Sequence, residues 1–346
     1  MTTIPPKTPP QTSPQAPVEA PAGMAAAPVA ASRRWTRETL IALTAFALFA
    51  LLPVLAAGLE DTFMVFFAIR VMVFAIAAVS LSLILGFGAL VSFGHAAYLG
   101  LGAYSVAILA EHGYWDVTIS LPVTLLVCGL FAAVTGAICL KTRGVYFIMI
   151  TLAFGQMAYY TATSLSAYGG DDGLTMWGRT EILGSGMLSD RTTFYYVVLG
   201  VLIFCYVLAR MIVASRFGRV LQGAKQSEMR LRAIGIDPYW YRLVAYVIAG
   251  MMAGLAGALL ANAAEFVSPA YMTWHRSGEL IVMVVLGGLG SLAGSIIGAA
   301  SFLVLEELLS HVTEHWRLIF GPFLVLVVLF GKGGLMALIP GGRKND

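Results

Sequence analysis

The chain has 346 residues, of which 59% are hydrophobic and only 11% are charged, against roughly 25% in an ordinary soluble domain. A mean hydropathy of +0.85 leaves too little polar surface for a water-exposed globule of this size, so lipid is expected to surround most of the chain. The net charge of +3 does not indicate a nucleic-acid partner. The three cysteines lie in apolar runs without ligand-like spacing, which disfavours a zinc site or a disulfide framework.

The first 31 residues are rich in Pro and Ala and have no apolar periodicity. Such a composition cannot bury a core, and it predicts a disordered cytoplasmic tail over residues 1–31. A transmembrane domain is expected to follow over residues 32–342.

Long apolar runs occupy most of that domain. A bilayer core about 30 Å thick needs about 20 apolar residues per helix. We therefore predict an all-α polytopic membrane protein of about ten transmembrane helices, near residues 39–57, 63–85, 94–110, 118–140, 145–165, 194–213, 241–263, 278–290, 292–309 and 317–339. Only Gly and Ser separate 278–290 from 292–309, so one kinked span with a re-entrant piece is the alternative there. Because most Lys and Arg fall in alternate connections, the positive-inside rule predicts cytoplasmic N- and C-termini.

Two apolar runs are broken by Gly and Ser at similar spacing, one at residues 86–95 and one at 287–294. In transporters, paired interruptions of this kind point to a substrate site, because half-helix ends present unpaired N–H or C=O groups. The predicted pathway residues are Gly86, Gly88, Ser92, Gly94, His95, Gln156, Gly287, Gly288, Gly290 and Gly294. The alternatives are close helix packing for the glycines, a structural donor for His95 and interhelical hydrogen bonding for Gln156. Gly250, Gly254 and Gly257 are predicted to form a packing face.

A cytoplasmic loop of 27 residues, 214–240, separates two predicted spans. Residues 219–234 predict one short helix that stops at Gly235, with Pro238 soon after. A membrane-surface helix is one interpretation, and docking to a cytosolic partner is the other. The chain has no P-loop, so a pump of this kind needs another chain to hydrolyse ATP.

Several stretches resemble the permeases of high-affinity branched-chain amino-acid ABC importers. They are SRFGRVL at 215–221 with AIGID at 233–237, GALVSFGHAAYLGLGAY at 88–104, RGVYF at 143–147 with TLAF at 151–154, GGDDGL at 169–174, and LGGLGSLAG at 286–294. Together they cover about residues 85–346, and the RGVYF and GGDDGL stretches favour the LivM-type subunit over its partner permease.

The resemblance implies a permease without catalytic residues, metal or cofactor of its own, in the bacterial inner membrane. Its implied partners are a second related permease, two cytosolic ABC ATPases that bind the ATP, a periplasmic binding protein that delivers Leu, Ile or Val, and membrane lipids. The predicted ATPase-coupling residues are Arg219, Leu221, Ala224, Ala233, Ile234 and Gly235, and the outer loop 166–193 is expected to face the binding protein. The alternatives are a permease for urea, short amides or other amino acids in the same family, an uncoupled channel, and a structural membrane protein.

Overall fold

The computed structural model describes residues 28–59, 62–182, 184–312, 315, 318, 320–322 and 334–338. By its internal contacts the chain divides into two units, residues 1–37 and 38–346. The predicted tail lies outside the described residues as far as residue 27, and helix α1 begins at Pro28, four residues before the predicted start of the membrane domain.

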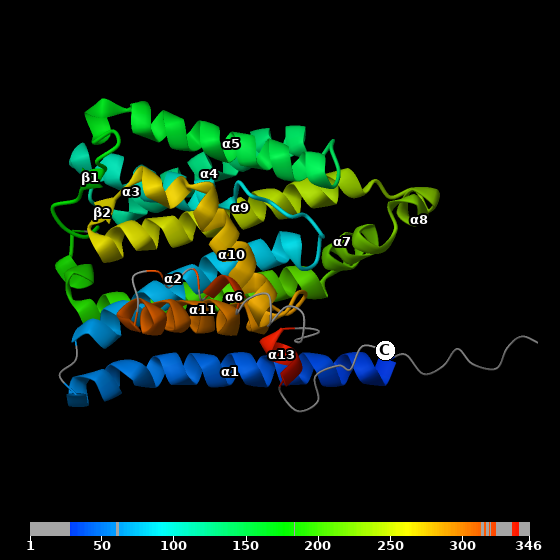
Figure 1. Ribbon diagram of the computed structural model, residues 1–346, viewed down its shortest axis with the longest axis horizontal. Helices are drawn as coiled ribbons and strands as arrows, with labels where there is room; N and C mark the ends of the chain where they lie inside the picture. The colour runs from blue at the N-terminus through cyan, green and yellow to red at the C-terminus, as the bar shows by residue number, and fades with distance from the viewer. Residues whose placement is uncertain are drawn as a thin grey trace, which may run out of the picture. The chain divides into compact units, whose positions relative to one another are not determined.

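Helices account for most of the described residues (Figure 1). The α-helices are α1 Pro28–Leu59, α2 Thr62–Leu85, α3 His95–Glu111, α4 Val117–Cys139, α5 Val145–Ser164, α6 Arg191–Ala214, α7 Arg216–Gln226, α8 Glu228–Ala233, α9 Pro238–Ala264, α10 Trp274–Gly287, α11 Leu292–Val312 and α13 Leu335–Leu338. The shorter elements are η1 Ser166–Tyr168, β1 Leu174–Thr175, η2 Gly186–Ser189, β2 Phe266–Val267 and η3 Pro269–Met272.

The prediction of an all-α polytopic membrane protein is confirmed. Within the described residues, seven helices are long and apolar enough to cross a membrane, namely α1, α2, α4, α5, α6, α9 and α11. Two further predicted spans form shorter helices, α3 with 17 residues and α10 with 14, because each adjoins a glycine-rich interruption. Most of the tenth predicted span, 317–339, lies outside the described residues.

Helices α2 and α9 form the core of the 38–346 unit. Every residue of α2 from Val71 to Leu85 is buried, and α2 packs against α6, α9, α10 and α11. Helix α9 crosses α3 and α4 so closely that a Cβ at Gly254 would overlap Cys128, and a Cβ at Gly257 would overlap the Leu99 carbonyl. The prediction that Gly250, Gly254 and Gly257 form a packing face is confirmed.

The two ends of this bundle differ in structure (Figure 1). At one end, β1 and β2 pair antiparallel, with Leu174 opposite Val267, and we call this the β1 end. The side chain of Asn262 accepts hydrogen bonds from the backbone and hydroxyl of Thr180, which fastens the loop 166–190 to α9. At the other end lie α7, α8, the α4–α5 turn and both glycine-rich interruptions, and we call this the α7 end.

Candidate functional site

The two glycine-rich interruptions, about two hundred residues apart in sequence, lie in contact at the α7 end. A Cβ built on Gly86 would lie 3.0 Å from the Gly290 backbone nitrogen and 2.7 Å from the Ser82 carbonyl. Gly290 itself has a φ of +85°, a conformation that side chains disfavour. Glycine is therefore required on both sides, and the interruptions after α2 and α10 form one junction.

A lysine from α7 reaches into this junction. The ammonium group of Lys225 donates a hydrogen bond of 2.8 Å to the carbonyl oxygen of Gly86, one residue beyond the end of α2. Carbonyl groups at a helix C-terminus carry partial negative charge, so a cation there is stabilising. Lys225 was not predicted to reach the junction, since 139 residues separate it from Gly86 and no local pattern connects them.

Buried polar groups lie behind the junction. His95 is fully buried, and its Nε2 lies 2.8 Å from the Ser80 hydroxyl, which donates to the Ala77 carbonyl at 2.7 Å. With the single Ser80 proton used there, the contact fits the His95 tautomer that carries its proton on Nε2 and donates it. Its Nδ1 and the hydroxyls of Ser82 and Ser92 are buried without a hydrogen-bond partner in the described part of the chain.

The remaining predicted pathway residues lie mainly at helix contacts. A Cβ on Gly94 would overlap the Thr151 carbonyl of α5, and a Cβ on Gly155 would lie 3.1 Å from the Gly94 backbone. Gly287 and Gly294 oppose each other where α10 meets α11. Gly88 adjoins Leu221, Gly288 adjoins Gly334, and Gln156 is half-buried on α5.

The predicted single helix over 219–234 is wrong, because the structure has two helices there. Helix α7 ends at Gln226, and Ser227 caps α8 by accepting a hydrogen bond from the Arg230 backbone N–H. Ser227 followed by Glu228 is itself a helix-start signal, and it marks the boundary that the prediction of one helix missed. The predicted stop at Gly235 is confirmed, since its φ is +80°.

The coupling residues divide into a buried and an exposed group. Leu221 is fully buried and Ala224 nearly so, which contradicts the expectation that Leu221 is available to a partner. A Cβ on Gly88 would lie 3.5 Å from a Leu221 methyl group, so this face of α7 supports the junction. Arg219, Ala233 and Ile234 are exposed, Ile234 by 69%.

A second polar group lies toward the β1 end of the same helices. Arg70 of α2 forms a 3.3 Å ion pair with Glu306 of α11, and Arg276 pairs with Glu279 at 2.6 Å on α10. The Arg276 guanidinium also lies 5.7 Å from the centre of the Phe74 ring, one turn from Arg70 on α2. These charges connect α2, α10 and α11, and ionisable residues within apolar spanning helices such as α2 and α11 are rare and usually paired.

The comparisons with known proteins agree with this architecture. The profile of a family described as "Branched-chain amino acid transport system / permease component" matches residues 63–329. The chain belongs to this family. Its members are ABC transporter permease subunits, which lack an ATPase site.

Relatives from two bacteria are similar over most of this length. The chain is 27% identical over 298 residues to the "High-affinity branched-chain amino acid transport system permease protein LivM" of Salmonella typhimurium, covering 78% of this chain and 69% of the relative. The Escherichia coli LivM protein gives 27% over 298 residues, 77% of this chain and 68% of the relative. The Salmonella typhimurium LivH permease is 28% identical over 163 residues, 46% of this chain and 53% of the relative. No solved structure matches the chain.

Proposed function

We propose that this chain is the LivM-type permease subunit of an ABC importer that carries leucine, isoleucine and valine across a bacterial inner membrane. Both termini are then cytoplasmic, with α7 and α8 facing the cytosol. A second, related permease completes the pathway, two cytosolic ABC ATPases bind and hydrolyse ATP, and a periplasmic binding protein delivers the substrate. Family membership and the similarity to LivM proteins support this assignment.

The observation that carries the mechanism is the hydrogen bond from Lys225 to the Gly86 carbonyl beside Gly290. A cytosolic ATPase docked on the exposed side of α7 and α8, including Ala233 and Ile234, would be linked to the junction through the buried side of α7. Movement of α7 would then withdraw the ammonium group from the end of α2. In this way ATP hydrolysis acts on the junction that we assign to the pathway.

The junction also suits a zwitterionic substrate. It brings together the C-terminal end of α2 and the N-terminal end of α11, and the first attracts an ammonium group while the second attracts a carboxylate. At the β1 end, the exposed Asp171 and Asp172 give the loop 166–193 an acidic surface for the binding protein. Charges of this kind chiefly raise association rates.

The test is transport by the complete assembly in liposomes. Binding protein loaded with leucine should stimulate ATP hydrolysis and drive uptake, while an assembly that carries Lys225→Gln should form normally but lose stimulation. Stimulation by urea or a short amide in place of leucine would move the chain to the alternative substrate class. Uptake that continues without ATPase chains would contradict the importer assignment and favour a channel.

A further inference from the structure

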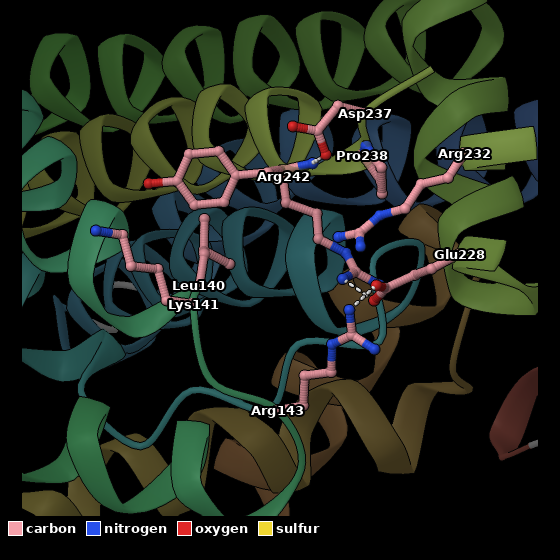
Figure 2. A pocket seen from close by; sticks show the side chains of 9 residues that line it. Leu140, Lys141, Arg143, Glu228, Arg232, Asp237, Pro238 and Arg242 are labelled. Carbon is pink, nitrogen blue, oxygen red and sulfur yellow. Dashed lines mark hydrogen bonds and ion pairs between the residues drawn. The ribbon is translucent and has the colours of Figure 1, made fainter. Parts of the chain in front are cut away.

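A polar cavity of about 360 Å³ lies at the α7 end, apart from the glycine junction. Leu140 and Lys141 at the end of α4, Arg143 before α5, Glu228 and Arg232 of α8, and residues 237–239 and 242 at the start of α9 line it. Figure 2 shows the guanidinium groups of Arg143, Arg232 and Arg242 pointing toward the Glu228 carboxylate. The volume falls within the range of small-ligand sites, about 300–1,000 Å³.

The cavity holds more positive than negative charge. Its one well-buried carboxylate, Glu228, is already shared between Arg143, at 2.5 Å, and Arg242. Its other carboxylate, Asp237, accepts a hydrogen bond from the Tyr239 backbone N–H at the start of α9. The side-chain cations of Lys141 and Arg232 have no ion-pair or hydrogen-bond partner among the described residues. The Arg242 Nε is buried and has none there either.

This surplus favours an anion with several acceptor oxygens. Guanidinium groups bind phosphate oxygens with two parallel hydrogen bonds, and a lysine adds a point charge. The floor of the cavity is fixed by the Arg143–Glu228–Arg242 ion pairs and by a 3.2 Å hydrogen bond from Arg242 to the Ala224 carbonyl. An incoming phosphate group would therefore find the cations already in place.

The position of the cavity points to the membrane as the source of that anion. It lies where α4 ends and where α5 and α9 begin, and the ends of spanning helices lie at the level of the lipid headgroups. Tyr146 and Trp240, which are close in sequence to the lining residues Arg143 and Tyr239, are 76% and 63% exposed, and such aromatic residues are enriched at the membrane interface. On α4, Leu126, Leu130, Val134 and Ile138 form an exposed apolar stripe that ends beside the cavity.

We propose that this cavity binds the headgroup phosphate of an anionic phospholipid, with Lys141 and Arg232 as its main charge partners and the α4 stripe against an acyl chain. Basic pockets at the cytoplasmic ends of spanning helices suit such headgroups. Arg143 and Arg242 both form ion pairs with Glu228 of α8. A lipid bound in the cavity would therefore hold α8 against the ends of α4 and α9. The proposal needs only a chain in a membrane and does not depend on the transported substrate.

The test uses the full-length chain in detergent, with bound lipids counted by native mass spectrometry during titration with phosphatidylglycerol or phosphatidylcholine. The variant Lys141→Gln with Arg232→Gln removes the two unpaired cations and leaves the Glu228 ion pairs intact. Its matched control, Arg216→Gln with Arg230→Gln, makes the same charge change on exposed residues of α7 and α8 outside the cavity. Size-exclusion profiles check folding, and the single variant Lys141→Gln provides a milder change.

We expect the double variant to bind phosphatidylglycerol about 30-fold more weakly, from about 1 kcal/mol for each of two cations at 1.36 kcal/mol per tenfold. Lys141→Gln alone should weaken binding about fivefold, the control pair should retain most of it, and phosphatidylcholine binding should not change. Equal losses in both double variants would overturn the proposal in favour of general surface attraction. Displacement of the lipid by millimolar inorganic phosphate would overturn it in favour of a soluble anion. If the Lys141→Gln, Arg232→Gln variant still binds lipid as the wild type does but no longer co-purifies with ABC ATPase chains, the proposal would be overturned in favour of a protein partner.

Discussion

The hydrogen bond between Lys225 and the Gly86 carbonyl gives the sharpest prediction about the junction. Replacing Lys225 by Gln removes the charge that lies 2.8 Å from the end of α2. A hydrogen bond to a charged group contributes about 1.5–3 kcal/mol, and a cation at a helix C-terminus about 0.3–1 kcal/mol. Since the lysine is exposed along much of its length, we expect a total nearer 1–2 kcal/mol. We call the junction open when Lys225 has left the Gly86 carbonyl and the interrupted segments have separated. The fraction of molecules with an open junction should therefore rise about 5- to 30-fold.

A cysteine at position 92 can report this opening. Ser92 is fully buried within the interrupted segment, and all three native cysteines, Cys128, Cys139 and Cys205, are buried as well, so the alkylation background is low. In Ser92→Cys membranes, a permeant maleimide should react about 5- to 30-fold faster once Lys225→Gln is added. When opening and reclosing are fast, this rate follows the open population.

Two controls accompany that measurement. Lys225→Arg keeps the charge and should restore most of the protection, whereas Arg219→Gln changes an exposed charge of the same helix and should leave the rate unchanged. Equal alkylation rates with and without Lys225→Gln would refute the view that this lysine holds the junction.

Three further expectations concern packing, ion pairing and pH. Gly94→Val should lower the thermal midpoint and the yield of folded protein, because its side chain would overlap the Thr151 carbonyl, and a normal midpoint would show that α5 can shift. Glu306→Gln should destabilise the protein by about 1–3 kcal/mol in thermal unfolding by leaving Arg70 unpaired, and the double change to Met should recover part of the loss. Hydrogen bonds from Thr193 hold the pKa of Asp190 below its usual value, so its stabilisation is complete above about pH 3.9 and is lost as the pH falls through the folded pKa. The difference in thermal midpoint between wild type and Asp190→Asn should therefore narrow with acidification, and a constant difference would contradict this.

Features that depend on neighbouring residues could be predicted from the sequence. The long apolar runs predicted the spanning helices because a helix that crosses the lipid core needs about 20 consecutive apolar residues. The stop at Gly235 and the packing glycines of α9 followed from the absence of a Cβ. The paired glycine interruptions were recognised by their spacing, although only the structure places Gly86 against Gly290.

Features that depend on long-range contacts could not be predicted in this way. The Arg70–Glu306 ion pair spans 236 residues of sequence, and Lys225 reaches Gly86 across 139. The inward orientation of Leu221 was missed because a short amphipathic helix offers its apolar side equally to a partner or to its own domain. Tertiary packing decides between these two orientations, and the residue pattern of a single sequence does not distinguish them.

The arrangement of α2, α10 and α11 constrains how the two ends of the bundle communicate. Each of these helices adjoins the glycine junction at one end and carries a member of the Arg70–Glu306 or Arg276–Glu279 pair toward the other. On α2, the fifteen positions from Val71 to Leu85 extend about 22 Å at 1.5 Å per residue, and all are buried. A helix packed on every side does not bend locally, since close-packed interiors transmit displacement. Withdrawal of Lys225 from the end of α2 is therefore expected to move α2 as a body and to alter its ion pair with α11, which is how a signal from α7 would reach the β1 end.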